Sequence, residues 1–111
     1  MKVSRGDVVW VEPGEARGTE QAGRRPYLVI SHDVFNDRFR TVIAMALTSR
    51  SQKMGFPLSH LLHSGHLPKE SWVKIGQVRS ISVLRIGRRI GRVDEAEVDR
   101  VVEGLMEIVG G

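Results

Sequence analysis

Residues 27–47, YLVISHDVFNDRFRTVIAMAL, contain the pattern that decides the fold. Both ends of this stretch are apolar and rich in β-branched side chains, which favours strands at Tyr27–Ser31 and Thr41–Leu47. Neither end alternates between apolar and polar residues, so we expect both faces of each strand to be covered. Asp33–Phe39 between them is predicted to be a short helical turn or loop. The pattern therefore places a buried sheet at the centre of the chain.

Further strands are expected on either side of this stretch. Two polar, glycine-containing loops interrupt the apolar runs, at Pro13–Gly23 and at Thr48–Gly55. Loops as long as the first are uncommon in a compact domain and are often functional. The predicted flanking strands are Asp7–Glu12, Phe56–Leu61, Ser71–Ile75 with Gln77–Ile81 (or one strand bent at Gly76), and a glycine-punctuated edge strand, Ile86–Val93.

The last segment has the periodicity of a helix. After Asp94, a good N-cap residue, apolar residues recur at the spacing of one helical face. Glu97 is expected to close a capping box with Asp94. Several short strands and one C-terminal helix predict a mainly β (α+β) domain spanning residues 1–111, a small, strongly bent antiparallel sheet or barrel with an amphipathic helix packed on it. One helix cannot cover such a sheet completely, so we expect a homodimer.

Length and composition exclude several classes of protein. The chain has 111 residues and no cysteine, which excludes a disulfide scaffold, thiolate catalysis and a thiolate zinc site. No apolar run approaches the roughly 18 residues of a membrane span. Residues 1–18 lack the apolar core of a signal peptide. We therefore expect a soluble, cytoplasmic protein without a membrane partner.

The formal net charge of +4 hides an asymmetry along the chain. From Asp94 onward six acidic residues accompany one arginine, whereas residues 1–93 carry 16 basic and seven acidic residues. Thirteen of the 17 basic residues are arginine, whose guanidinium can grip phosphate with two parallel hydrogen bonds. The basic body favours a polyanion partner. The alternative is a mixed-charge surface that only keeps the protein in solution.

The first polar loop ends in a group of side chains suited to an anion. Residues 18–26 read GTEQAGRRP, so a hydroxyl, a carboxylate, an amide and two arginines precede the buried strand. Pro26 holds Arg25 in an extended conformation at the start of that strand. The loop is therefore a candidate ligand site. The alternative is a solvated connection whose arginines pair with Glu12 or Glu20.

These motifs resemble those of the MazF/PemK family of toxin endoribonucleases. The resemblance spans nearly the whole chain, and its G-x-E-Q-x-G-x-R-P core is specific. The similar stretches are residues 5–11 (RGDVVWV), residues 18–31 (GTEQAGRRPYLVIS), Thr48-Ser49 and residues 77–81 (QVRSI), followed by the amphipathic helix.

The resemblance implies a fold, an activity and a set of site residues. Family members form compact SH3-like barrels, act as homodimers and cut single-stranded RNA (mRNA) at short sequences without a metal ion or other cofactor. The 2′-hydroxyl usually attacks the adjacent phosphate, leaving a 2′,3′-cyclic phosphate and a 5′-hydroxyl. A cognate antitoxin with a flexible acidic segment inhibits them. The catalytic arginine and threonine of the family map onto Arg25 and Thr48, and RNA contacts map onto Thr19, Glu20, Gln21, Ser49, Gln77 and Arg79.

Elementary chemistry supports part of this assignment. A preorganised guanidinium and a hydroxyl would stabilise the charge that develops on the phosphoryl oxygens. An arginine pKa above roughly 12 leaves little neutral form at neutral pH. We therefore expect Arg25 mainly to stabilise charge, and its part in proton transfer stays open.

Other residues suggest rival roles. His60, His63 and His66 have the spacing H-x2-H-x2-H, which could serve acid–base catalysis or zinc. Pro57, Gly65 and Pro68 break a continuous helix there, so ordinary loop histidines are favoured. The arginines at 85, 88, 89 and 92 could contact phosphates or simply protect an edge strand, with Arg88 and Arg92 on one face and Arg89 on the other. Trp10 is expected in the core, whereas Trp72 could be core or a stacking surface.

Two other functions fit parts of the sequence. The same fold serves toxins that bind and poison DNA gyrase, although that branch does not use this catalytic pair. A basic RNA-binding module without chemistry is the second rival. The RNA sequence that would be cut is not predicted.

Overall fold

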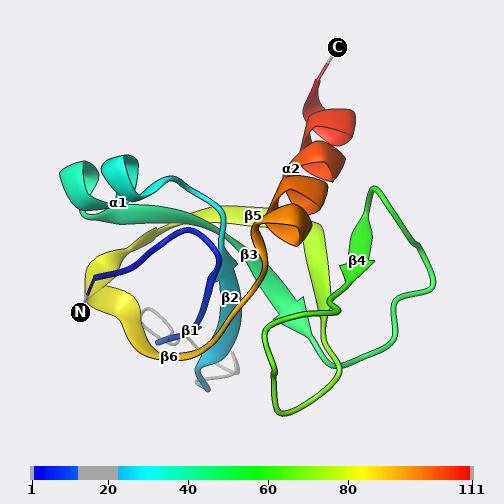
Figure 1. Ribbon diagram of the computed structural model, residues 1–111, viewed down its shortest axis with the longest axis horizontal. Coiled ribbons are helices and arrows are strands. Elements are labelled where there is room, and N and C mark those ends of the chain that lie inside the picture. The colour runs from blue at the N-terminus through cyan, green and yellow to red at the C-terminus, as the bar shows by residue number, and fades with distance from the viewer. Residues whose placement is uncertain (1, 13–22, 111) are drawn as a thin grey trace, which may run out of the picture.

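The computed structural model describes residues 2–12 and 23–110. The elements follow one another as β1 (Asp7–Val11), β2 (Arg25–Val29), α1 (Asp33–Phe39), β3 (Thr41–Thr48), β4 (Ser59–Leu61), β5 (Trp72–Ser82), the 3-10 turn η1 (Val83–Arg85), β6 (Ile86–Arg92) and α2 (Glu95–Val109). Figure 1 shows α2 rising from the sheet toward the C-terminus, with α1 at the opposite side.

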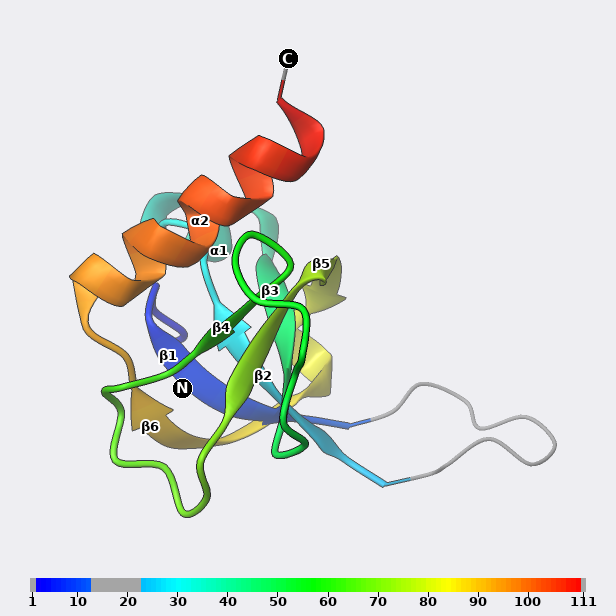
Figure 2. The same cartoon turned by 90° about the vertical axis from the view of Figure 1, so that its right-hand side faces the viewer.

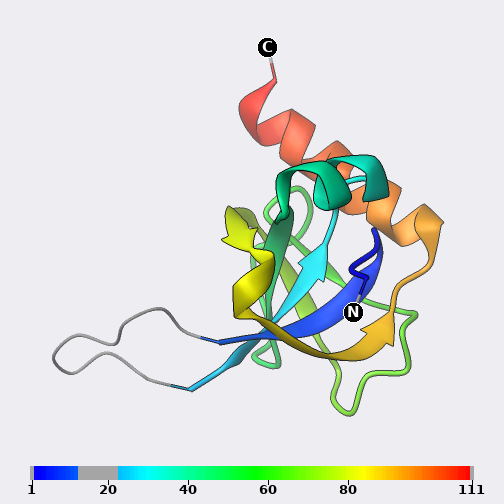
Figure 3. The same ribbon diagram turned by 90° about the vertical axis from the view of Figure 1, so that its left-hand side faces the viewer.

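All six strands form one antiparallel sheet with the order β4-β5-β3-β2-β1-β6. The sheet curls strongly, and its edges are β4 and β6, so it is barrel-like but open. β1 and β6 run side by side (Figure 3). The predicted mainly β architecture with a C-terminal helix is confirmed.

Two apolar clusters occupy the two faces of the sheet. Leu28 and Met45 belong to the cluster that α2 covers with Val98 and Val101. Val29 lies in the second cluster, with Val42, Ala44 and Ile81. Because successive side chains of a strand alternate between faces, β2 and β3 are buried on both, as their unbroken apolar sequences predict. Figure 2 shows α2 lying across one end of the curled sheet.

The segment predicted as two strands or one bent strand is a single long strand. β5 runs without interruption from Trp72 to Ser82. Its pairing with β3 is irregular: Met45 lies opposite Val78, but Leu47 lies opposite Val73. Additional residues of β5 are accommodated there, which bends the strand. β4 is shorter than predicted, and β2 begins two residues earlier, at Arg25.

Arg5 and Asp7, at the start of the stretch RGDVVWV, form ion pairs with segments that are distant in the sequence. The guanidinium of Arg5 donates to Glu95 and Asp99 of α2, each at 2.9 Å, and to the carbonyl of Ile30. The carboxylate of Asp7 is 2% exposed and accepts a hydrogen bond of 2.8 Å from Arg92. This motif therefore serves the fold, joining β1 to α2 and to β6.

The predicted capping box at the start of α2 is wrong. Asp94 occupies the N-cap position, but its side chain makes no capping hydrogen bond. The hydroxyl of Ser64 accepts from the Asp94 N–H at 3.0 Å and donates to Glu97 at 2.6 Å. A serine 30 residues earlier in the chain thus takes the place of the local cap, and Glu97 turns toward the segment after β4.

Over the described residues, neither α1 nor α2 combines the length and the apolar character needed to cross a membrane.

Candidate functional site

A groove of about 460 Å³ lies where three strands end. The end of β1, the start of β2 and the end of β3 meet there because the three strands are antiparallel neighbours. β6 and the segment after β4 complete its walls. The groove therefore collects side chains from five separate parts of the chain.

Arg25 and Thr48 both line this groove. In the β2–β3 ladder Tyr27 pairs with Ala46 and Leu28 with Met45. Arg25 and Thr48 lie two residues beyond the Tyr27–Ala46 pair, at the same end of the two neighbouring strands. Arg25 is exposed and Thr48 is half-buried. The fold thus brings into one groove the two residues to which the resemblance assigns catalysis, although they are 23 positions apart in the chain.

The Thr48 hydroxyl is already oriented by a local contact. Its oxygen accepts a hydrogen bond of 3.1 Å from the backbone N–H of Arg50. A hydroxyl that accepts in this way still has its own hydrogen to donate. The turn after β3 therefore leaves Thr48 able to donate toward an anion in the groove.

Positive charge dominates the groove. Arg24, Arg25 and Lys69 line it, and no carboxylate is among its described lining residues. Arg24 lies over the ring of Trp10, 5.2 Å from its centroid, in a cation–π contact. The expectation that Trp10 belongs to the core is wrong: it is half-buried and lines the groove. The site thus offers cations and an aromatic wall to an anionic ligand.

A second wall comes from residues that the sequence did not single out. Leu67, Pro68, Lys69 and Ser71 line the groove together with the strand residues. They belong to residues 62–71, here called the wall segment, which connects β4 to β5. No local motif marks them, because only the sheet topology brings this connection beside β2 and β3.

The other predicted RNA contacts are distributed differently. Ser49 lines the groove beside Thr48. Thr19, Glu20 and Gln21 lie outside the described residues. Gln77 and Arg79 are exposed on β5, where Arg79 lies opposite Ala44, and neither lines the groove. The structure therefore unites Arg25, Thr48 and Ser49, and leaves Gln77 and Arg79 further along the sheet.

The side chains of Arg89 and Arg92 in β6 do not point to opposite faces of the sheet as simple strand alternation predicts. Arg92 and Arg89 both approach the same oxygen of Asp7, at 2.8 Å and 3.6 Å. The prediction that Arg92 and Arg89 face opposite ways is therefore wrong. The β1–β6 ladder shifts register between Val8 and Val9 and again before Val11, which changes the side-chain order.

His60 of β4 and the following His63 and His66 are not arranged as a metal centre. Within residues 2–12 and 23–110, no group of three His, Cys, Asp or Glu side chains is placed to hold a metal ion. His60 instead contacts Glu97 of α2 through Nε2 at 2.6 Å. The backbone N–H groups of His63 and Ser64 donate to the same carboxylate at 2.8 to 3.0 Å.

These contacts set the ionisation of Glu97. Burial alone raises the pKa of Glu97. Hydrogen bonds from the Ser64 and His60 side chains and from the His63 and Ser64 backbone stabilise the carboxylate, and together they bring its pKa below the ordinary value. Because folding lowers this pKa, Glu97 stabilises the fold above the unfolded-state value of about 4.5, and this stabilisation is lost as the pH falls through the folded-state pKa.

We expect the Glu97→Gln substitution to lower the free energy of unfolding by about 1–3 kcal/mol at neutral pH, since it removes hydrogen bonds to a charged group. The gap between the native protein and this variant should shrink as the pH falls to about 3. Urea unfolding across this pH range measures it. Glu103→Gln is the control, since Glu103 is an exposed acid of the same helix. An equal gap at both ends of the pH range would contradict the assignment.

The chain is similar to several known proteins over nearly its whole length. The chain is 33% identical over 107 residues to Endoribonuclease EndoA of Bacillus subtilis, covering 95% of this chain and 92% of that protein. It is 30% identical over 112 residues to Endoribonuclease MazF6 of Mycobacterium tuberculosis, covering 98% of both. The MazE-MazF crystal structure from Deinococcus radiodurans superposes with a TM-score of 0.83 at 27% identity, covering 99% of this chain and 97% of that one.

The match to a protein family covers almost the whole chain. Residues 4–109 match the family described as PemK-like, MazF-like toxin of type II toxin-antitoxin system. This range includes every described element and the groove with Arg25 and Thr48. The resemblance inferred from the motifs is confirmed: the chain belongs to the PemK-like, MazF-like family of type II toxins.

Proposed function

We propose that this protein is the toxin of a type II toxin–antitoxin pair and an endoribonuclease that cuts single-stranded RNA, including mRNA, in the groove holding Arg25 and Thr48. The observation that supports the proposal is that Arg25, at the start of β2, and Thr48, at the end of β3, line the same groove. The relatives named as endoribonucleases support the same activity. A gyrase poison or a non-catalytic RNA-binding module would not need this arrangement.

The reaction we propose is an internal transfer at one phosphate. The 2′-oxygen attacks the adjacent phosphorus, the bond from phosphorus to the 5′-oxygen breaks, and the 2′-proton is balanced by one delivered to the leaving oxygen. The products are a 2′,3′-cyclic phosphate and a 5′-hydroxyl. Arg25 would donate two hydrogen bonds to the phosphoryl oxygens, and Thr48 would donate a third.

The positive charge for this step would come from the protein. Arg25, with Arg24 and Lys69 nearby in the groove, offsets the phosphate charge, so we propose that cleavage needs no metal ion or other cofactor. Cleavage should persist in excess chelator. An RNA with a single 2′-deoxy nucleotide at the cut position should stay intact there, because the nucleophile is missing. Cutting at that modified position would contradict the proposed chemistry.

The partners follow from the same surface. We propose that a cognate antitoxin covers the cationic groove with a flexible acidic segment and so competes with RNA. The solved MazE-MazF complex of a relative supports an antitoxin partner.

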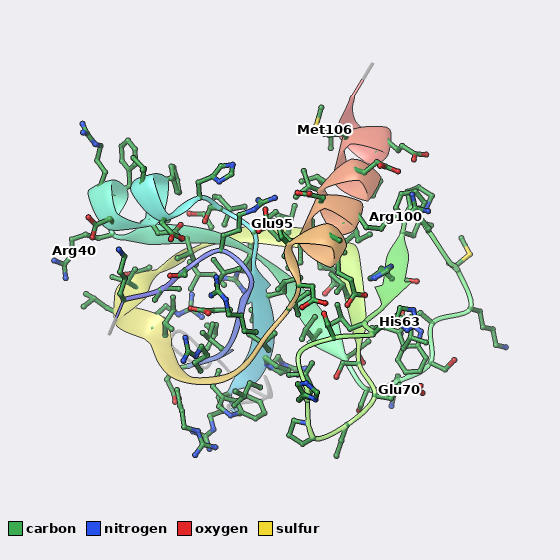
Figure 4. The ribbon with its side chains drawn as sticks, viewed as in Figure 1. Arg40, His63, Glu70, Glu95, Arg100 and Met106 are labelled. Atoms are coloured by element: carbon green, nitrogen blue, oxygen red, sulfur yellow. The ribbon has the colours of Figure 1, made fainter. Side chains whose placement is uncertain are left out.

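We also propose that the protein forms a homodimer. Met106 and Val109 at the end of α2 are 59% and 67% exposed, so they leave apolar surface that a second copy could cover. Figure 4 shows Met106 near the projecting end of that helix.

Lys69 should contribute binding energy without taking part in the reaction. We expect Lys69→Ala to raise KM several-fold with little change in kcat, because a phosphate contact on the groove wall acts equally on the bound and the reacting RNA. The slope of log K against log salt should become shallower by about 0.7, the value for one contact to a single strand. Lys2→Ala is the control, since Lys2 lies beside α1, away from the groove. An unchanged salt slope would remove Lys69 from the binding surface.

A further inference from the structure

The Glu97 carboxylate of α2 bonds to β4 and to the segment that follows it. Its carboxylate accepts hydrogen bonds from the Ser64 hydroxyl, from the backbone N–H groups of His63 and Ser64, and from the His60 ring, at 2.6 to 3.0 Å. The Glu97 side chain is only 14% exposed. One carboxylate of α2 therefore fixes the path of the backbone at the start of the wall segment. Figure 4 shows His63 on this connection.

The fixed residues lead directly into the groove. Ser64 is followed after two residues by Leu67, Pro68 and Lys69, which form the wall facing Arg25 and Thr48. Such a short connection cannot absorb a shift of Ser64 without passing it on to Leu67. The position of the wall thus depends on the point at which Glu97 holds the chain.

The wall segment also packs closely against β6, which restricts its position. Gly65 has a φ of +101°, a conformation that other residues rarely adopt, and His66 has a φ of 50°. The backbone of this turn lies against Gly91 of β6, where an added Cβ would be 2.6 Å from the Gly65 oxygen and 2.7 Å from Leu67. The turn therefore packs against β6 on one side and is hydrogen-bonded to Glu97 of α2 on the other.

We propose that Glu97 is a positioning residue of the RNA groove, acting through Ser64 and His60 on the wall formed by Leu67, Pro68 and Lys69. This inference rests on the proposed ribonuclease activity of the groove. Glu97 itself does not line the groove. Its effect on RNA would therefore be indirect, through the distance between the two walls.

The chemistry of the site calls for a carboxylate. The groups converging on Glu97 are hydrogen-bond donors, and an ionised carboxylate is an acceptor only, with two oxygens to receive them. A glutamine would present an amide NH2, itself a donor, to one side of this group. The Glu97→Gln substitution should therefore release part of the wall segment while keeping the size of the side chain.

The test compares Glu97→Gln with Glu103→Gln on a short fluorogenic RNA, at a temperature where circular dichroism shows both variants folded. We expect Glu97→Gln to raise KM about 5- to 20-fold and to leave kcat within about two-fold, as for a loss of uniform binding. Simple electrostatics predicts the opposite sign, because removing a negative charge should tighten the binding of a polyanion. Glu103→Gln removes the same charge from α2 and should leave KM unchanged or slightly lower it.

A structural readout accompanies the kinetics. The amide hydrogens of His63 and Ser64, which donate to Glu97, should exchange faster in Glu97→Gln than in the native protein. Ser64→Ala should raise KM in the same direction, and the double variant should be little worse than Glu97→Gln alone, because both substitutions remove one attachment. Should Glu97→Gln fail to fold, His60→Ala removes the ring contact with Glu97, and Ser64→Ala removes the hydroxyl that bonds both Glu97 and the Asp94 N–H. Both variants carry the same expectation.

The outcomes separate this inference from the proposed function. If the native protein cuts RNA and Glu97→Gln has the KM of Glu103→Gln, the positioning role is wrong and the ribonuclease assignment stands. If the native protein does not cut RNA, the proposed function has failed, and the inference falls with it. A raised KM with faster amide exchange at His63 and Ser64 supports the role.

Discussion

Arg25→Ala should slow RNA cleavage by about 10²- to 10³-fold while leaving the protein folded, a loss typical of removing one preorganised donor to a developing oxyanion. Arg25 is exposed at the start of β2 and is not among the residues of either apolar cluster. Its removal therefore takes one of the three cations from the groove without opening the core. Single-turnover cleavage of a fluorogenic RNA, with circular dichroism to verify folding, measures the effect.

The adjacent arginine supplies a matched control for charge. Arg24 also lines the groove, but it lies over the Trp10 ring. Arg24→Ala should therefore weaken RNA binding modestly and keep kcat. Arg25→Lys should recover only part of the lost rate, because an ammonium group lacks the two-pronged geometry of a guanidinium. Near-native cleavage by folded Arg25→Ala would remove this residue from the mechanism.

Thr48→Val should lower kcat by about 10- to 10²-fold, with a smaller change in KM, since valine keeps the shape but cannot donate to the phosphate. The hydroxyl oxygen of Thr48 also accepts from the Arg50 N–H, so its loss could disturb the turn after β3. Thr48→Ser separates the two effects, because serine keeps both hydrogen bonds.

Rate measurements on the two variants decide the role of Thr48. We expect Thr48→Ser to stay within a few-fold of the native rate and Thr48→Val to fall well below it. Equal rates for the two variants would show that the hydroxyl is not used in the reaction. Melting temperatures of both variants should stay close to that of the native protein, because Thr48 lies at a strand end rather than in the core.

The local sequence pattern was sufficient to predict most of the helices and strands. The apolar strands on either side of Asp33–Phe39 were predicted to within two residues at each end, and that segment forms the short helix α1. The amphipathic spacing after Asp94 likewise identified α2. In each case neighbouring residues determine the element, through hydrophobic periodicity and N-cap preference.

Failures occurred where a distant part of the chain competes with a local partner. The capping box was wrong because Ser64 reaches Asp94 and Glu97 from another element. Trp10 sits on an apolar strand, yet the end of that strand opens into the groove. Arg92 and Arg89 both approach Asp7 because the β1–β6 ladder shifts register, and the local sequence does not predict these shifts. Such contacts depend on tertiary register, which one-dimensional periodicity does not contain.

The residues of the candidate site likewise divide into those that the sequence identified and those that only the tertiary structure reveals. Motif resemblance identified Arg25 and Thr48, and the antiparallel pairing of β2 with β3 brings both to one groove. It also identified Ser49, which lines the groove. The wall segment was missed, because Lys69 and Leu67 reach the site only through the sheet topology and the attachment of Ser64 to Glu97. The roles of Thr19, Glu20, Gln21, Gln77 and Arg79 stay predictions for mutagenesis.

The central claim is that the groove of Arg25 and Thr48 cuts RNA. Its most direct test is to incubate the purified protein with a long single-stranded RNA in excess chelator, then to ligate and sequence every new 5′-hydroxyl end, with Arg25→Ala in parallel. We predict cuts at one short recurring sequence in the native sample and their near absence with Arg25→Ala. RNA that is bound but intact, or equal cutting by Arg25→Ala, would contradict the account.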